Sequence, residues 1–221
     1  MSDALSIYFA GDLFDHKDLI GNALLAAHIE QESSGQYKCL LPQDFEQGSN
    51  RKEHIRDQDL KMVMEADLGL FNFDGADLDS GTVVEFIVAK QLDIPSVVLR
   101  SDFRNAGDQD SKGDKWNLMC SFYPRTEIVS INGMEWYQQA REGHLPVEET
   151  IKSLYKRLAT QLITAFDKAR SDAPLATEPE FMEKLYQWAV TFPGAGFESF
   201  IGDKNWVADV IEKKKRKGLI G

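Results

Sequence analysis

Hydrophobic positions along the chain alternate between short apolar runs and longer segments in which they recur at helical spacing. The apolar runs have the length and β-branched character of strands, and they cover 5–10, 37–41, 68–73, 95–99 and 128–131. Helical spacing follows each of the first three runs, at 19–27, 55–66 and 82–92. This alternation predicts an α/β fold of the flavodoxin-like or Rossmann-like, doubly wound kind, with a mostly parallel five-stranded sheet and flanking helices.

The second half of the chain is richer in helical patterns, which lie at 147–168, 180–191 and 203–217. A Ser-Asp-Ala-Pro sequence breaks the pattern at 171–174, so we expect a main domain at 1–169 and a helical C-terminal extension at 170–221. The polar stretch 101–115 is too long for an ordinary connection, which predicts a mobile loop with a lid as one candidate role. The basic run 213–217 fits an anion-binding or nuclear-localisation patch, but cations at a helix C-terminus also complement the helix dipole, and we favour that interpretation.

Composition narrows the classes of function. The 221 residues carry a formal net charge of -11, which argues against a surface for nucleic acid, and 43% are hydrophobic, as in ordinary globular proteins. Cys39 and Cys120 are the two cysteines, and we expect both to be reduced, buried thiols. The histidines lack metal-ligand spacing and no glycine-rich nucleotide motif occurs, so we expect neither metal nor cofactor. Without a signal-peptide pattern or a long apolar stretch, we expect a cytoplasmic protein that does not bind membranes.

Ligands of doubly wound folds bind beyond the carboxyl ends of the strands, and two loops there stand out. Gly11 ends the first strand and allows close approach of the backbone. After the third strand, three aspartates within six residues precede Thr82-Val83-Val84-Glu85. This tetrapeptide fits a capping box in which Glu85 reaches back to the start of the helix. It equally fits a first-turn carboxylate that the helix N-terminus keeps ionised, as a nucleophile must be.

Two motifs resemble those of a known protein family. Tyr-Phe-Ala-Gly-x-Leu-Phe at 8–14 and Asp-Ser-Gly-Thr-x-x-Glu at 79–85 resemble the nucleoside 2-deoxyribosyltransferases. Ala66-Asp67, the stretch 99–104 and Asn-Leu-Met at 117–119 follow the same family pattern in the same order. The resemblance implies an enzyme that cleaves the N-glycosidic bond of 2′-deoxynucleosides with retention and passes the sugar to an acceptor base.

The resemblance also assigns roles to residues. It implies that Glu85 is the nucleophile, that Tyr8 orients or activates it, and that Asp59 protonates the leaving base. Asp79 would bind sugar hydroxyls, and the remaining substrate-binding positions are Gly11, Phe14 as a wall beside C2′, Gln43, Gly81, Asn117 and Met119. Asn117 and Met119 would complete the site of a neighbouring subunit, so we expect a homo-oligomer, a dimer or larger. Each residue also has an ordinary structural interpretation: Tyr8 as a strand residue, Asp59 as a solvated helix position, Asn117 as a helix cap.

Two departures from the family pattern put the substrate range in doubt. Asp12 stands where proline is usual, and Phe86 to Ala89 replace the common Leu-Gly-Tyr-Ala. Two alternatives to base transfer therefore stay open. One is hydrolysis of deoxynucleosides or their 5′-monophosphates, although the acidic loop at 74–79 disfavours a phosphate. The other is a non-catalytic module that senses nucleosides.

Overall fold

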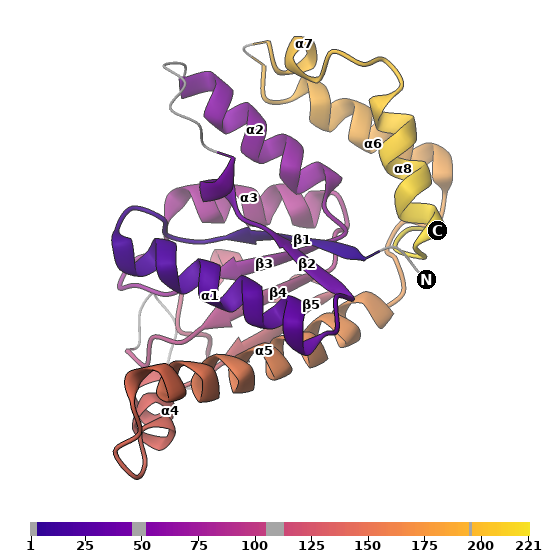
Figure 1. Cartoon of the computed structure of the whole chain (residues 1–221). Coiled ribbons are helices and arrows are strands. Elements are labelled where there is room, and N and C mark those ends of the chain that lie inside the picture. Colours follow the sequence, from indigo (N-terminus) through magenta and orange to yellow (C-terminus); the bar gives the residue numbers. More distant parts are fainter. Residues whose placement is uncertain (1–3, 46–51, 105–112, 195) are drawn as a thin grey trace.

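The computed structural model describes residues 4–45, 52–104, 113–194 and 196–221 (Figure 1). Five parallel strands form one sheet in the order β2-β1-β3-β4-β5. The strands are β1 (Leu5–Ala10), β2 (Tyr37–Leu40), β3 (Leu68–Asn72), β4 (Ser96–Arg100) and β5 (Thr126–Ser130). Every strand overlaps the apolar run that predicts it, although β5 begins two residues earlier than predicted, and the predicted α/β fold with a five-stranded parallel sheet and helices on both faces is confirmed.

Helices cover both faces of the sheet (Figure 1). One face carries α1 (His16–Glu32), α4 (Gly133–Ala140) and α5 (Val147–Ser171). The other carries α2 (Lys52–Glu65), α3 (Ser80–Gln91) and the extension, which contains α6 (Pro179–Thr191), α7 (Phe197–Ile201) and α8 (Trp206–Arg216). Two short 3-10 helices, η1 (Pro42–Asp44) and η2 (Leu118–Cys120), complete the described elements. The predicted helix at 203–217 begins three residues late, and α4 and α7 were not predicted because so few turns carry little periodicity. Most of the predicted loop at 101–115 lies outside the described residues.

The central strands β1, β3 and β4 are buried on both faces, because helices cover both sides of the sheet and side chains alternate between them. Ile7 and Phe9 of β1 pack toward α1 and α5, whereas Tyr8 and Ala10 pack toward α2 and α3. Each face therefore has its own apolar cluster. This alternation directs Tyr8 toward the side of the sheet on which α3 carries Glu85.

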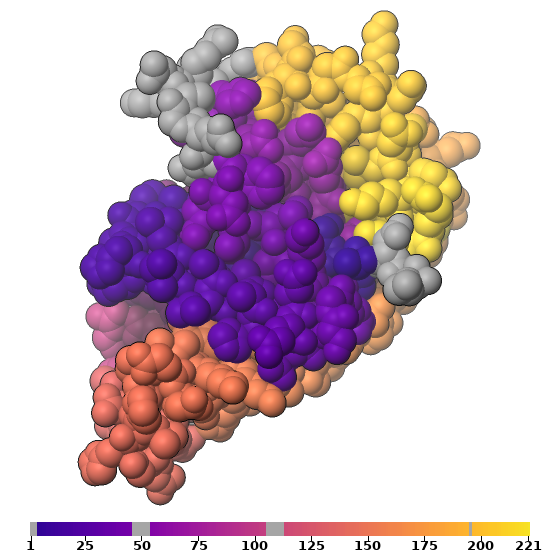
Figure 2. Space-filling view, viewed as in Figure 1, coloured from indigo at the N-terminus to yellow at the C-terminus, as the bar shows by residue number. Residues whose placement is uncertain are grey.

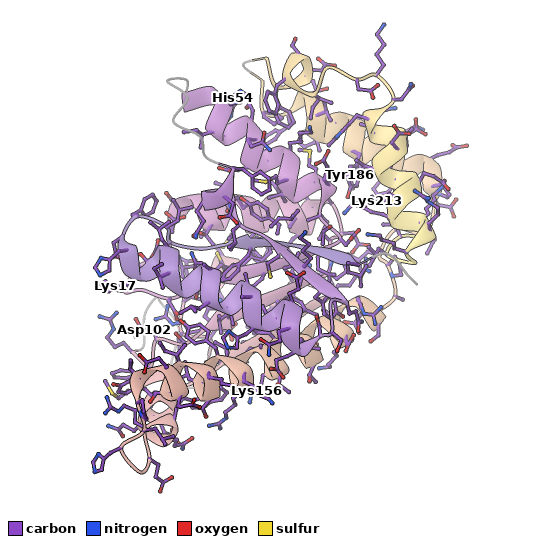
Figure 3. The ribbon with its side chains drawn as sticks, viewed as in Figure 1. Lys17, His54, Asp102, Lys156, Tyr186 and Lys213 are labelled. Carbon is purple, nitrogen blue, oxygen red and sulfur yellow. The ribbon has the colours of Figure 1, made fainter. Side chains whose placement is uncertain are left out.

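The C-terminal extension shares the cluster on the α2 and α3 face. Met182, Tyr186 and Phe197 are fully buried there, and Trp206 is nearly so. The basic run at 213–217 lies in and just after the last turn of α8, as the helix-dipole interpretation requires, and Figure 3 labels its first residue, Lys213. Two of its lysines are also engaged with the main domain, since Lys214 donates to the Ala66 carbonyl and Lys217 donates to Asp67 at 2.6 Å. Among the described helices, none combines the length and apolar character of a membrane span.

Both cysteines are free, but they differ in exposure. Cys120 is buried, as predicted, whereas Cys39 is only half-buried. Burial raises the pKa of the Cys39 thiol to about 12, with a smaller contribution from Glu30. Both side chains are therefore protonated, unreactive thiols near neutral pH.

Candidate active site

A tyrosine and a glutamate from distant parts of the chain meet at the carboxyl end of the sheet. The Tyr8 hydroxyl of β1 donates a hydrogen bond of 2.6 Å to Oε1 of Glu85 on α3. Tyr8 is 1% exposed, whereas Glu85 is half-buried. A short bond from a rigid, buried donor fixes one carboxylate oxygen in place. The pair that the sequence predicts is thus brought together.

The start of α3 corrects one interpretation of this stretch. The N-cap is Asp79, whose Oδ2 accepts from the Thr82 amide at 2.7 Å and from the Thr82 hydroxyl at 2.9 Å. Thr82 is therefore not the cap of a capping box, and Glu85 accepts a hydrogen bond from Tyr8 on β1. Because α3 begins at Ser80, Glu85 lies in the second turn, and the expectation of a first-turn carboxylate is wrong. The helix N-terminus holds Asp79 more directly than Glu85.

Two glycines make close packing possible around these residues. A Cβ atom on Gly11 would lie 3.0 Å from Cβ of Asn72, at the end of β3. A Cβ atom on Gly81 would lie 3.0 Å from Oδ2 of Asp79. Either side chain would press on neighbours that shape the carboxyl end of the sheet, so both positions favour glycine for reasons of space.

Acidic side chains dominate the electrostatics of this end of the sheet. Burial raises the pKa of Asp12, and the nearby carboxylates of Asp79, Asp18, Asp74 and Asp15 raise it further. The Asp12 that replaces the family's proline thus adds to a concentration of negative charge.

Asp74 has a structural task in this acidic cluster. Its carboxylate accepts from the Ser101 amide and hydroxyl, both at 2.6 Å, and from the Asp102 amide at 2.7 Å. These bonds join the loop after β3 to the loop after β4. Asp102 is in turn held by Arg104, whose hydrogen bonds are the main reason that the pKa of Asp102 falls to about 2.

The other predicted site residues differ in their exposure. Asp59 is half-buried on α2. Gln43 lies in η1 and its Nε2 donates to the Leu19 carbonyl at 2.9 Å, while its buried Oε1 accepts no hydrogen bond from the described residues. Phe14 is 77% exposed, in the loop after β1. Within the described ranges, no group of three His, Cys, Asp or Glu side chains is arranged to hold a metal ion.

A cavity of about 590 Å³ lies beside the start of α3. It is lined by Ala76, Asp77, Leu78, Ser80, Val83, Val84, Trp116, Asn117, Met119 and Cys120. Asn117 caps η2, because its Oδ1 accepts from the Met119 amide at 2.9 Å, so its structural interpretation is confirmed. Asn117 and Met119 are nevertheless exposed, Met119 by 75%. The sequence analysis did not predict the apolar lining from Val84 and Trp116. The position of Trp116, directly before the Asn-Leu-Met motif, was the one indication of it in the sequence.

These features define an α/β protein with an acidic site at the carboxyl end of a parallel sheet, centred on a tyrosine-bound glutamate. The family model of the nucleoside 2-deoxyribosyltransferases matches residues 7–119, which contain this site, and the chain belongs to that family. The recognition made from the two sequence motifs is therefore confirmed.

Solved structures similar to the chain come from several organisms. A conserved protein from Enterococcus faecalis V583 is 24% identical, with a TM-score of 0.49, and the match covers 70% of this chain and 99% of that one. A 2-desoxiribosyltransferase from Leishmania mexicana is 18% identical, with a TM-score of 0.46 and coverages of 64% and 99%. A 2-deoxyribosyltransferase from Bacillus psychrosaccharolyticus is 19% identical, with a TM-score of 0.37 and coverages of 48% and 77%. No curated protein matches the chain.

Proposed function

We propose that the protein transfers 2-deoxyribose between nucleobases, taking the sugar from a 2′-deoxynucleoside and delivering it to a free base. The observation that carries the proposal is the hydrogen bond between Tyr8 and Glu85 at the carboxyl end of the sheet, in a chain of this family. The domain at 1–169 would hold the catalytic residues. The substrates would be deoxynucleosides and free nucleobases.

In the first step, a carboxylate oxygen of Glu85 attacks C1′ of the deoxyribose. The Tyr8 hydroxyl holds Oε1, so the carboxylate keeps one orientation while it attacks the sugar. The bond between C1′ and the base nitrogen breaks, and its electron pair leaves with the base. Asp59, as a carboxylic acid, gives the base its proton, and a deoxyribosyl ester of Glu85 remains.

Asp79 is suited to orient the sugar during this attack. Both of its hydrogen bonds from Thr82 go to Oδ2, which leaves Oδ1 to accept from a sugar hydroxyl. Holding the sugar by a hydroxyl brings C1′ to a fixed distance from Glu85, and such positioning supplies much of the rate of a displacement. Phe14 would form the wall beside C2′, and Gln43 would contact the base.

In the second step, a nitrogen of the acceptor base attacks C1′ and the ester bond breaks, returning the electron pair to Glu85. Asp59 takes up the proton that the acceptor loses. Two displacements at one carbon retain its configuration. Hydrolysis would follow if water replaced the base. The negative charge around Asp12 argues against 5′-monophosphates as the main substrates, because a phosphate would be repelled.

Incubation with 2′-deoxyinosine, with and without free cytosine or adenine, tests this function directly when products are separated by chromatography. We expect a new deoxynucleoside only when the acceptor base is present. Release of hypoxanthine at a rate that the acceptor does not change would establish a hydrolase. Binding of deoxynucleosides without release of any base would establish the sensing module.

We further propose that the site is shared between subunits of a homo-oligomer. Asn117 and Met119 are exposed on the rim of the cavity beside α3, where a second subunit can reach them. Mixing Glu85→Ala and Asn117→Ala subunits should restore part of the transfer activity, because some sites then combine an intact Glu85 with an intact Asn117. No recovery in mixtures shown by sizing to contain both subunits would count against sharing.

A further inference from the structure

The C-terminal extension holds α2 at its carboxyl-terminal end. The indole Nε1 of Trp206, at the start of α8, donates a hydrogen bond of 2.7 Å to Oε1 of Glu65, the last residue of α2. Trp206 is only 8% exposed, so its ring also packs in the cluster that α2 shares with the extension. A buried indole with a satisfied donor is a rigid contact, because losing the acceptor would leave a buried polar group unpaired.

The extension also holds the beginning of α2. The ring of His54 meets the edge of Phe200 on α7, with ring centroids 5.0 Å apart at an angle of 86°. Arg56 donates from Nη1 to the Pro193 carbonyl at 3.3 Å, just beyond the end of α6. Figure 3 labels His54 on this side of α2, and Figure 2 shows the gold and yellow atoms of the extension lying against the purple atoms of the main domain. The extension thus contacts both ends of one helix.

Helical geometry separates the contacts of Trp206 and Phe200 from Asp59. His54 and Glu65 are eleven residues apart, which at 3.6 residues per turn places them on nearly the same side of α2. Asp59 is five residues from His54, which turns it about 140° away from that side. Trp206 and Phe200 therefore contact one side of the helix while Asp59 projects from another, and Arg56, three residues before Asp59, reaches the extension from nearer to the Asp59 side. An effect of Trp206 or Phe200 on Asp59 must pass through the helix itself.

We propose that the extension is a positioning element in which Trp206 and Phe200, acting through α2, fix the place of Asp59 against the nucleobase. The inference rests on the proposed function, because it needs Asp59 to exchange a proton with the base. A proton donor must lie within hydrogen-bonding reach of its target, and a misplacement of about 1 Å can cost a large part of the rate. Trp206 and Phe200 are positioning residues, since neither is assigned a contact with the substrate.

Trp206→Phe tests the proposal, because it removes the donor to Glu65 but keeps an aromatic ring. The matched control is Trp188→Phe on α6, whose ring is 54% exposed and stacks on Phe192. We expect Trp206→Phe to lower kcat/KM for transfer about fivefold, the size expected for one lost hydrogen bond. The control should equal the wild type, with both variants assayed well below their unfolding temperatures. Phe200→Leu, a milder change at the other end of α2, should act in the same direction.

A double-mutant cycle separates positioning from general weakening of the fold. In an Asp59→Asn background, Trp206→Phe should cause no further loss of the residual transfer, because the group that it positions is already disabled. An equal loss in both backgrounds, or equal activities of the Trp206 and Trp188 variants, would overturn the inference. The same holds if Asp59→Asn is fully active. A wild-type protein that transfers no deoxyribose would instead defeat the proposed function itself.

Discussion

The two ends of the sheet use charge in opposite ways. Beside the ion pair of Asp102 with Arg104, the carboxyl end gathers four acidic side chains, which are Asp12, Asp74, Asp79 and Glu85. The amino end buries charges as pairs of opposite sign, which are Asp67 with Lys217 at 2.6 Å and Asp93 with Arg125 at 2.9 Å. Like charges that face one another cost stability, so they persist where chemistry or binding needs them. Buried pairs of opposite charge hold parts of the chain together. The contrast supports the proposed function at the carboxyl end and indicates that the charged pairs of the amino end assemble the fold.

Hydrogen bonds at the amino end of the sheet hold the extension near its first and near its last residues. Oδ2 of Asp93 accepts from the Leu175 amide at 2.8 Å, near the start of the extension. Arg125 donates to the Leu219 carbonyl at 3.0 Å, near its last residues. The extension is thereby held to the main domain by a polar cluster as well as by the apolar one.

Glu85→Gln should produce the largest effect at the carboxyl end. An amide cannot attack C1′, so we expect transfer to fall at least about a thousandfold, as for the loss of other catalytic nucleophiles. The Gln oxygen still accepts from Tyr8, so the midpoint of thermal unfolding should stay within a degree or so of the wild type. Product chromatography and thermal unfolding measure the two quantities. A large drop in the unfolding midpoint would show that this end of the sheet also supports the fold.

Asp93→Ala should produce the largest effect at the amino end. It leaves Arg125, whose side chain is 1% exposed, without its buried partner, and breaking a buried pair costs about 3–5 kcal/mol. Urea unfolding should show this loss, while the folded fraction keeps its transfer activity. Glu127→Ala is the control, because it breaks the exposed contact of Glu127 with Lys168 and should change stability little. An Asp93 variant that is stable but inactive would reverse the assignment of the two ends.

The strands could be predicted because strands that are buried on both faces have continuous apolar runs in the sequence. The main helices could be predicted because their apolar residues recur at helical spacing. The cap of α3 could not, since Asp77, Asp79 and Ser80 are all good caps and only the folded loop selects Asp79. The contact of Tyr8 with Glu85 joins positions 77 residues apart, and only the family resemblance put them in one site. Periodicity alone predicts which residues lie on the buried face of a helix or strand. It does not predict which loops lie close together.

The amino end was not predicted at all. Its charged residues stand singly at strand starts or within the basic run at 213–217, and a charge pattern indicates an exposed surface more readily than a buried pair. Lys214 shows the difficulty, since it is 2% exposed within a run of cations. The carbonyl that Lys214 contacts belongs to Ala66, which is distant in the sequence. The residues around Lys214 therefore do not indicate this contact.

Lys214→Met should alter how stability depends on pH. Burial lowers the pKa of Lys214 to about 7, against an ordinary value of 10.5, and nearby Asp67 opposes that shift only in part. Between pH 7 and 10 the unfolded chain therefore binds the extra proton, and the stability of the wild type rises with pH. The variant should unfold at a higher temperature than the wild type at pH 7, with a smaller rise toward pH 9. Lys90, whose pKa burial also lowers to about 7, should preserve part of the rise. A variant that unfolds earlier at pH 7 and keeps the whole rise would contradict this.

Asp12→Asn should have the smallest effect, and it tests what the negative charge at the carboxyl end does. The pKa of Asp12 is raised by burial and by its acidic neighbours, so its ionised form destabilises the folded state above the ordinary carboxyl pKa. The variant should therefore show a slightly higher urea midpoint at pH 7, and the difference should shrink as the pH falls and the wild-type carboxyl takes up its proton. Asp172→Asn, an exposed change at the end of α5, should show neither effect. Removing one negative charge should also weaken repulsion of a 5′-phosphate, so deoxynucleoside monophosphates should gain relative to deoxynucleosides in kcat/KM. An unchanged ratio would mean that the acidity of the carboxyl end serves the reaction at C1′ and does not select against phosphate.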